Sequence, residues 1–164
     1  MNAMGKDKIL SVTKPFEVRF SEVDSMGVVW HGHYAMYFED AREAFGAKYG
    51  LEYLMMYGKG YFEPIVELTF KYKRVMIYGM KPEITITYRP CEAAKIIFDY
   101  EIRDTETGEV IVTGHSVQVF MDAKSHQLVL TSPDFYEEWK QRWEVKLTSP
   151  DFYEEWKQRW EVKI

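Results

Sequence analysis

The segment from Gly32 to Tyr49 constrains the fold most, because its apolar residues recur with the period of a long helix. The recurring residues, spaced at i, i+4, i+7 and i+11, are Tyr34, Phe38, Ala41 and Phe45. This spacing places them on one helix face, and Gly50 follows as a typical C-terminal residue. A helix with so wide an apolar face is stable only when another layer covers it.

The pattern around this helix predicts that the covering layer is an antiparallel sheet. Before the helix, apolar and polar residues alternate from Phe16 to Ser21, which predicts a first strand. Residues Thr105 to Gly108 have the composition of a hairpin turn, and short connections favour antiparallel pairing. The sequence therefore predicts an α+β fold, with the sheet wrapped around one helix. Four more strands are predicted after the helix, at Phe62–Tyr72, Glu83–Arg89, Lys95–Arg103 and Glu109–Met121.

The 164 residues fit one domain with short extensions. We expect residues 1–13 to form a flexible lead-in and residues 14–146 to form the domain. Residues 147–163 repeat residues 130–146 letter for letter, so 147–164 are predicted to be a duplicated helical segment without a function of its own. Because Phe152, Trp156 and Trp160 repeat one apolar face, an added packing or oligomer contact is the alternative.

Composition narrows the functional class. A net charge of −5 gives no support for general nucleic-acid binding. The single cysteine, Cys91, rules out an internal disulfide and a cysteine-based zinc site, and we expect no metal and no cofactor. No stretch reaches the length of a membrane span, and the polar N-terminus does not resemble a signal peptide. We therefore expect a cytoplasmic protein.

The segment that joins the first strand to the helix brings chemical groups together. Asp24 supplies a carboxylate, and His31 and His33 lie where the helix should begin. Helix N-termini also offer unpaired backbone amides that can hold a developing oxyanion. These are the parts of an acyl-transfer hydrolase. Each of these residues also has a purely structural interpretation. Asp-x-x-Gly is an ordinary turn sequence, and histidines at a helix start often only cap the helix or face solvent.

The run from Phe20 to Tyr34, followed by Phe38-Glu39-x-x-Arg42, resembles the 4-hydroxybenzoyl-CoA thioesterase family, whose fold is the hotdog fold. The resemblance implies an acyl-CoA thioesterase in which Asp24 is the nucleophile or the general base. It also implies that His31 belongs to the site and that a nearby helix amide is the oxyanion donor. Sites of this family lie between subunits, so a homodimer or homotetramer is expected.

Four aromatic residues are the predicted substrate contacts, and for the first two a place in the core is the alternative: Trp30, Tyr34, Tyr61 and Phe62. The acyl chain that they would accept cannot be read from the sequence. Two other functions stay open. One is hydrolysis of thioesters on an acyl carrier protein, and the other is acyl-CoA binding without catalysis.

Overall fold

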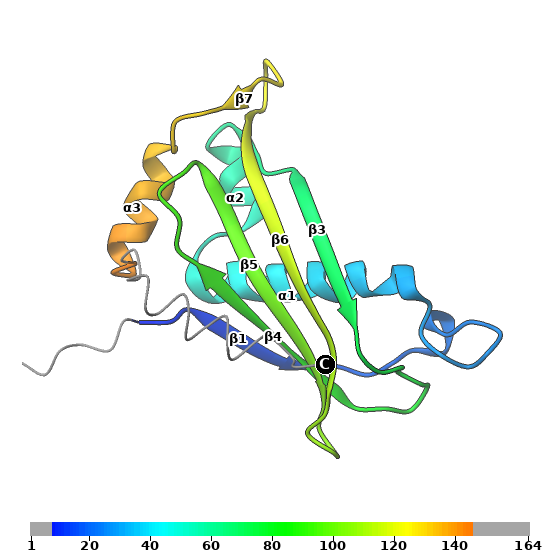
Figure 1. The fold of residues 1–164 in the computed structure, drawn as a ribbon. Coiled ribbons are helices and arrows are strands. Elements are labelled where there is room, and N and C mark those ends of the chain that lie inside the picture. Colours follow the sequence, from blue (N-terminus) through cyan, green and yellow to red (C-terminus); the bar gives the residue numbers. More distant parts are fainter. Residues whose placement is uncertain (1–7, 146–164) are drawn as a thin grey trace, which may run out of the picture.

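The computed structural model describes residues 8–145, in which one long helix, α1 (Tyr34–Tyr49), lies across an antiparallel sheet (Figure 1). The sheet order is β1-β4-β5-β6, and β6 then pairs with β2, β3 and β7. This α+β arrangement agrees with the predicted hotdog fold. The strands are β1 (Ser11–Pro15), β2 (Tyr61–Phe62), β3 (Ile65–Tyr72), β4 (Pro82–Arg89), β5 (Lys95–Asp104), β6 (Val110–Asp122) and β7 (Leu128–Val129).

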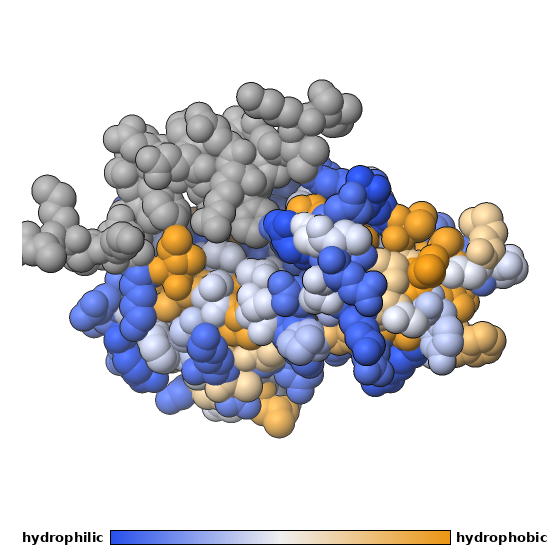
Figure 2. Space-filling model, turned by 90° about the horizontal axis from the view of Figure 1, so that it is seen from below, coloured by the Kyte–Doolittle hydropathy of each residue, from blue (hydrophilic) through white to orange (hydrophobic). Residues whose placement is uncertain are grey.

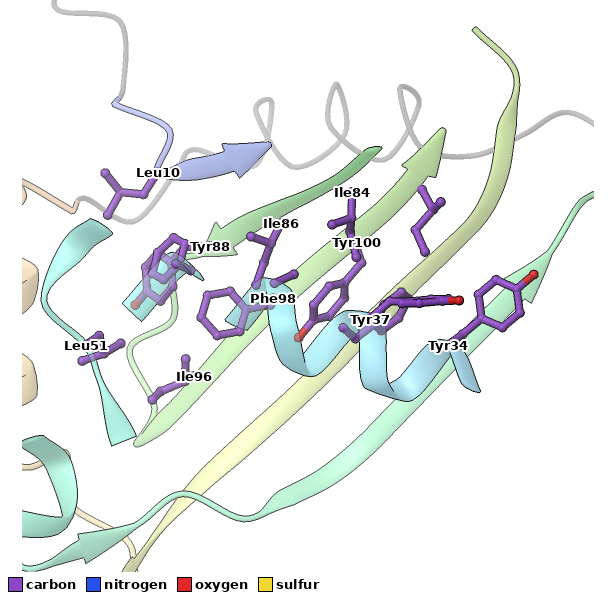
Figure 3. Close-up of a cluster of buried hydrophobic side chains, with 14 of the residues drawn as sticks. Leu10, Tyr34, Tyr37, Leu51, Ile84, Ile86, Tyr88, Ile96, Phe98 and Tyr100 are labelled. Atoms are coloured by element: carbon purple, nitrogen blue, oxygen red, sulfur yellow. The ribbon is translucent and has the colours of Figure 1, made fainter. Parts of the chain in front are cut away.

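The periodic residues of α1 form the centre of the core, as the sequence predicts. Phe38 and Phe45 are fully buried, and the ring of Phe38 stacks on Tyr100 of β5 at 4.1 Å between centroids. Gly50 ends the helix with a φ of 79°, and its amide donates to the carbonyl of Gly46 at 2.8 Å. Figure 3 shows how side chains from α1 and the sheet fill the space between the two layers.

The strand predicted from Phe16 to Ser21 is wrong. The first strand is β1, which pairs with β4 and lies partly in the predicted lead-in. Residues 16–19 then form no regular element, and Phe20–Glu22 is a short 3₁₀ helix. The alternation has another cause, because Phe16 packs against Tyr37 on α1 and Val18 is buried in the core.

Two short helices complete the described chain. Helix α2 (Tyr53–Gly58), which was not predicted, follows α1 and precedes β2. Helix α3 (Asp134–Arg142) shows that the first copy of the repeat is helical after Ser-Pro-Asp. Its Trp139 and the following Trp143 each donate an indole N–H to the carbonyl of Tyr49, at 2.8 Å. The second copy, residues 147–163, lies outside the described residues.

Candidate active site

Asp24 heads a tight turn that comes shortly before α1. Its carbonyl accepts the amide of Gly27 at 2.9 Å, and its amide donates to the carbonyl of Val28 at 2.8 Å. The carboxylate Oδ1 accepts the amide of Met26 at 2.8 Å and the amide of Val28 at 3.4 Å. Gly27 has a φ of +78°, which suits glycine. The turn reading of this motif is thus confirmed, and the same bonds fix the orientation of the half-buried carboxylate.

The loop after this turn is tied to the sheet and enters α1 through a single 3₁₀ turn, His31–His33. The hydroxyl of Tyr72, at the end of β3, donates to the carbonyl of His31 at 2.6 Å. The His31 ring is exposed and lies 5.2 Å from the Trp30 ring, whose indole covers Gly32. A Cβ on Gly32 would stand 2.4 Å from that indole, so glycine at this position lets Trp30 lie over the helix start.

The second histidine has a partner that the sequence did not reveal. Nε2 of His33 lies 2.7 Å from Oε2 of Glu22, a buried carboxylate. Oε1 of Glu22 accepts the amide of Arg19 at 2.7 Å, so both oxygens are held. His33 is therefore anchored to the chain before it, whereas the His31 side chain is exposed and Asp24 is half-buried on the loop. Glu22 and His33 line a cavity of about 560 Å³ between residues 14–22 and α1.

The predicted substrate contacts fall into two groups within one chain. Trp30 is 53% exposed beside His31, and Tyr34 is buried directly behind the loop, edge-on to Tyr72. Burial raises the pKa of Tyr34 to about 12, so its hydroxyl keeps its proton at neutral pH. Tyr61 and Phe62 are in β2, at the opposite end of β3, a strand of eight residues and therefore about 25 Å long. One chain does not bring these two residues to Asp24.

A polar network lies beneath the middle of α1, and its extent was also not foreseen. The guanidinium of Arg42, a buried residue, donates to the hydroxyls of Tyr53 and Tyr100, each at 3.1 Å. The Tyr100 hydroxyl also lies 2.7 Å from Oγ of Ser116. Gln118 extends the network towards β2, since its side-chain amide donates to the carbonyl of Glu63 at 2.9 Å and to Tyr53 at 3.4 Å.

Glu63, at the end of this network, is a buried acid whose carboxyl group is poorly satisfied. It is 8% exposed, and Oε2 is buried without a hydrogen-bond partner among the residues that the structure describes. Burial raises the pKa of Glu63 to about 7. Nothing in the local sequence, Tyr61-Phe62-Glu63-Pro64, distinguishes this acid from a solvated one. Its burial comes from long-range pairing of the neighbouring strands with β6.

The described residues offer neither a metal site nor a membrane-spanning helix. Between residues 8 and 145, no group of three or more His, Cys, Asp and Glu side chains is placed to hold a metal ion. In the same range, no helix has both the length and the apolar character needed to cross a membrane.

Known proteins resemble the chain over most of this fold. YneP of Bacillus subtilis (strain 168), provisionally assigned as an acyl-CoA thioesterase, is 30% identical over 112 residues, which cover 68% of this chain and 80% of YneP. The crystal structure of a DHNA-CoA thioesterase from Staphylococcus aureus is 27% identical, with a TM-score of 0.72 over 84% of this chain and 97% of that one.

The fold is shared with a more distant structure as well. A 4-hydroxybenzoyl-CoA thioesterase variant bound to 4-hydroxybenzoyl-CoA is 18% identical, with a TM-score of 0.69 over 79% of this chain and 98% of that one. The model of the thioesterase-like superfamily matches residues 18–139, a span that includes the Asp24 turn, α1 and the sheet from β2 to β7. Like the relatives named above, which are thioesterases and so hydrolyse thioesters, the chain belongs to the thioesterase-like superfamily.

Proposed function

We propose that the protein hydrolyses acyl-CoA thioesters and that Asp24 is its catalytic residue. The observation that carries this proposal is the position of the Asp24 carboxylate, held by backbone amides on the loop that leads into α1. Family membership supports the reaction class. The names of YneP and of the Staphylococcus aureus enzyme support a coenzyme A thioester as the substrate class.

The chemistry needs an oxygen nucleophile and a site for the oxyanion. Asp24 either attacks the thioester carbonyl itself or takes a proton from the water that attacks it. The carbonyl oxygen then receives hydrogen bonds from the first amides of the turn His31–His33. The amide of His33 already donates to the carbonyl of Trp30 at 2.9 Å, so the amides of His31 and Gly32 are the proposed donors.

His31 and the aromatic residues complete the proposed site. The exposed His31 ring stands next to Trp30, where it can contact the thioester or the acyl group. We keep Trp30, Tyr34, Tyr61 and Phe62 as proposed substrate contacts, with the buried Tyr34 lying behind the loop that carries Trp30. Because Tyr61 and Phe62 are far from Asp24 within one chain, they can reach the same substrate only from a second subunit. The proposal therefore includes a homo-oligomer, and light scattering that shows an active monomer at assay concentration would contradict it.

The test compares two aspartates that head similar turns. Asp104 also accepts the amide two residues ahead, that of Glu106, at 2.9 Å, and its turn also contains a glycine with positive φ, Gly108. Asp24→Asn should lower kcat on the best acyl-CoA substrate by about 10² to 10⁴, the range for loss of a general base or more for a nucleophile. Asp104→Asn should leave kcat unchanged. Thermal melting of both variants separates effects on stability from effects on rate.

The outcomes discriminate among the candidate functions. If Asp24→Asn and Asp24→Ala both stay within about tenfold of the unsubstituted protein, below the general-base range, Asp24 does not carry the reaction. If the unsubstituted protein retains acyl-CoA without releasing thiol, it is a binding module. Faster turnover of an acyl-carrier-protein thioester than of the matching acyl-CoA would assign it to the carrier-protein class.

A further inference from the structure

The outer edge of β3 is open among the described residues and has the features of a self-pairing strand. β3 pairs with β6 on one side, and Val66 and Tyr72 are 59% and 48% exposed. The amide of Lys73 donates to the carbonyl of Ile111 at 2.8 Å, in register with the pair Tyr72 and Val112. Because hydrogen-bonded pairs alternate in an antiparallel ladder, the odd-numbered residues bond β6. The even-numbered residues from 68 to 72 therefore direct their amides and carbonyls to the open edge.

This alternation and the charges of β3 select one register for two copies. In a two-fold antiparallel pair, even-numbered residues must face even-numbered residues, so the axis passes through a residue and not between two residues. Placing the axis at Thr69 uses nearly the whole strand and sets Glu67 opposite Lys71 of the second copy, twice. Placing it at Leu68 would set Glu67 opposite Thr69 and leave both charges unmatched. Placing it at Phe70 would set Glu67 opposite Lys73, outside β3, and would pair fewer residues of the strand. The occupant that fits this edge is therefore a second copy of this chain.

The same register brings the start of one β3 to the loop of the other chain. With the axis at Thr69, Glu63 of the second copy lies near the level of Val75. Met76 and Ile77, which follow Val75, hold the loop before α1 in place. The carbonyl of Met76 accepts the amide of Val29 at 2.8 Å, and Ile77 forms a bridge with Val28. Antiparallel pairing keeps both α1 helices on one face of the joined sheet, and Gln118, which bonds the backbone of Glu63, faces that layer.

Exposed apolar residues agree with a contact at this end of the molecule. Val75 is 64% exposed, Tyr78 61% and Met26 79%. Figure 2 shows hydrophobic side chains gathered at the right-hand end, which in Figure 1 carries the loop before α1. A second copy paired along β3 would cover part of this surface, as expected for a patch of this kind.

We propose that Glu63 acts in the site of the second copy, as the proton donor to the sulfur that leaves the thioester. This inference rests on the proposed function, in which Asp24 activates the attack. Water oxygen bonds to the carbonyl carbon, Asp24 takes its proton, and the C–S bond breaks with the electron pair going to sulfur. The Glu63 proton then bonds to that sulfur and gives the free thiol. Glu63 regains a proton from solvent, and Asp24 releases to solvent the proton that it took from water. Oε2 of Glu63 is enclosed by its own chain, so Oε1, which accepts no hydrogen bond within residues 8–145, is the oxygen that would carry the proton to the sulfur.

The decisive experiment uses heterodimers purified through two different affinity tags. Asp24→Asn and Glu63→Gln should each lose about 10²-fold or more in kcat as homodimers. A heterodimer of the two variants contains one site with both native residues if Glu63 acts across the interface, and it should recover half of the unsubstituted rate. If Glu63 served Asp24 of its own chain, this heterodimer would stay inactive.

The reciprocal heterodimer is the matched control. It pairs the unsubstituted chain with a chain that carries both substitutions. The inference predicts almost no activity, because each site then lacks one residue, whereas action within one chain predicts half of the unsubstituted rate. Full activity of the Glu63→Gln homodimer would overturn the inference and leave the role of Asp24 standing. Full activity of the Asp24→Asn homodimer would overturn the proposed function itself.

Disulfide trapping tests the register without any substitution at Glu63. In a Cys91→Ser background, Thr69→Cys places two thiols opposite each other on the axis, within the Cα separation that a disulfide needs. It should form a covalent dimer under mild oxidation. Lys71→Cys faces Glu67 and should not link to itself. Linkage of Lys71→Cys in place of Thr69→Cys would remove Glu63 from the second site and contradict the inference.

Discussion

The loop before α1 and the network beneath α1 are both polar, but the chain holds them in different ways. The Asp24 carboxylate is held by backbone amides at the surface, so its orientation depends on the shape of the turn. Arg42, Tyr100 and Ser116 are held by one another in the interior, where a lost partner leaves a buried group unsatisfied. The difference indicates that substitutions in the loop should change the rate more than stability, and substitutions in the network the reverse.

The largest effect on stability should come from Tyr100→Phe. This change keeps the ring that stacks on Phe38 but removes the hydroxyl that serves Arg42 and Ser116. Since each buried group left unpaired costs about 1–3 kcal/mol, the free energy of unfolding should fall by about 3 kcal/mol. Denaturant titration measures this loss, and kcat per folded molecule should be unchanged.

Tyr37→Phe is the matched control for that prediction. The Tyr37 hydroxyl is buried and lies close to the Glu22 carboxylate, but within residues 8–145 it does not reach the geometry of a full hydrogen bond. Removing it should change the free energy of unfolding by less than about 1 kcal/mol. Equal losses in the two tyrosine variants would show that the network does not stabilise the fold more than ordinary packing does.

A second prediction concerns the acid at the end of the network. Burial raises the pKa of Glu63 from 4.5 to about 7, so the folded protein binds a proton that the unfolded chain releases between these values. The stabilising contribution is therefore complete below about pH 4.5 and is lost as the pH rises to about 7. Its size should be on the order of 3 kcal/mol, because a pKa difference of one is worth about 1.4 kcal/mol. Glu63→Gln should remove this slope, as denaturant titrations at several pH values and one protein concentration can check. An unchanged slope would place the titration elsewhere.

A third prediction sharpens the comparison at the loop. Gly27→Ala introduces a side chain at a φ of +78°, although open space surrounds the position, so the cost of about 1 kcal/mol is purely conformational. Because the turn orients Asp24, kcat should fall as well. Gly58→Ala is the control, since it also meets open space but lies in α2 and should stabilise the helix by up to about 1 kcal/mol. A Gly27→Ala variant that is less stable but fully active would separate the shape of the turn from the rate.

Elements with local causes could be predicted from the sequence. The period of α1 and Gly50 gave the helix and its end, and the strands from β3 to β6 fell close to their predicted ranges. The Asp24 turn could be predicted because its residues bond one another over four positions. The segment from Phe16 to Ser21 could not, since its alternation follows from packing against Tyr37 and the core and not from strand pairing.

Site features that depend on distant contacts were not predictable. His33 meets Glu22 only because the chain turns at Asp24 and doubles back on itself. Glu63 is buried because β2 and β3 pair with β6, 40 to 61 residues later. A lone glutamate or histidine carries no sign of such a partner, whereas a capped helix or a glycine turn does.

The smallest effect should follow removal of residues 147–164, which tests whether both regions are complete without the second repeat. In the first copy, Trp139 and Trp143 already occupy the Tyr49 carbonyl at the end of α1, so an identical second copy has no vacant equivalent. A chain truncated after Lys146 should keep its kcat within about twofold, because the Asp24 turn and the Arg42 network have their partners within residues 8–145.

Identical substitutions in the two copies provide the control. Trp139→Phe removes a buried indole and its bond to Tyr49 and should cost about 1–3 kcal/mol, whereas Trp156→Phe should cost almost nothing. Equal costs in the two copies, or a folded truncated chain that has lost activity, would show that the second copy supports the fold or the site. A truncated chain that keeps its rate but changes its mass in light scattering would instead assign the second copy to assembly.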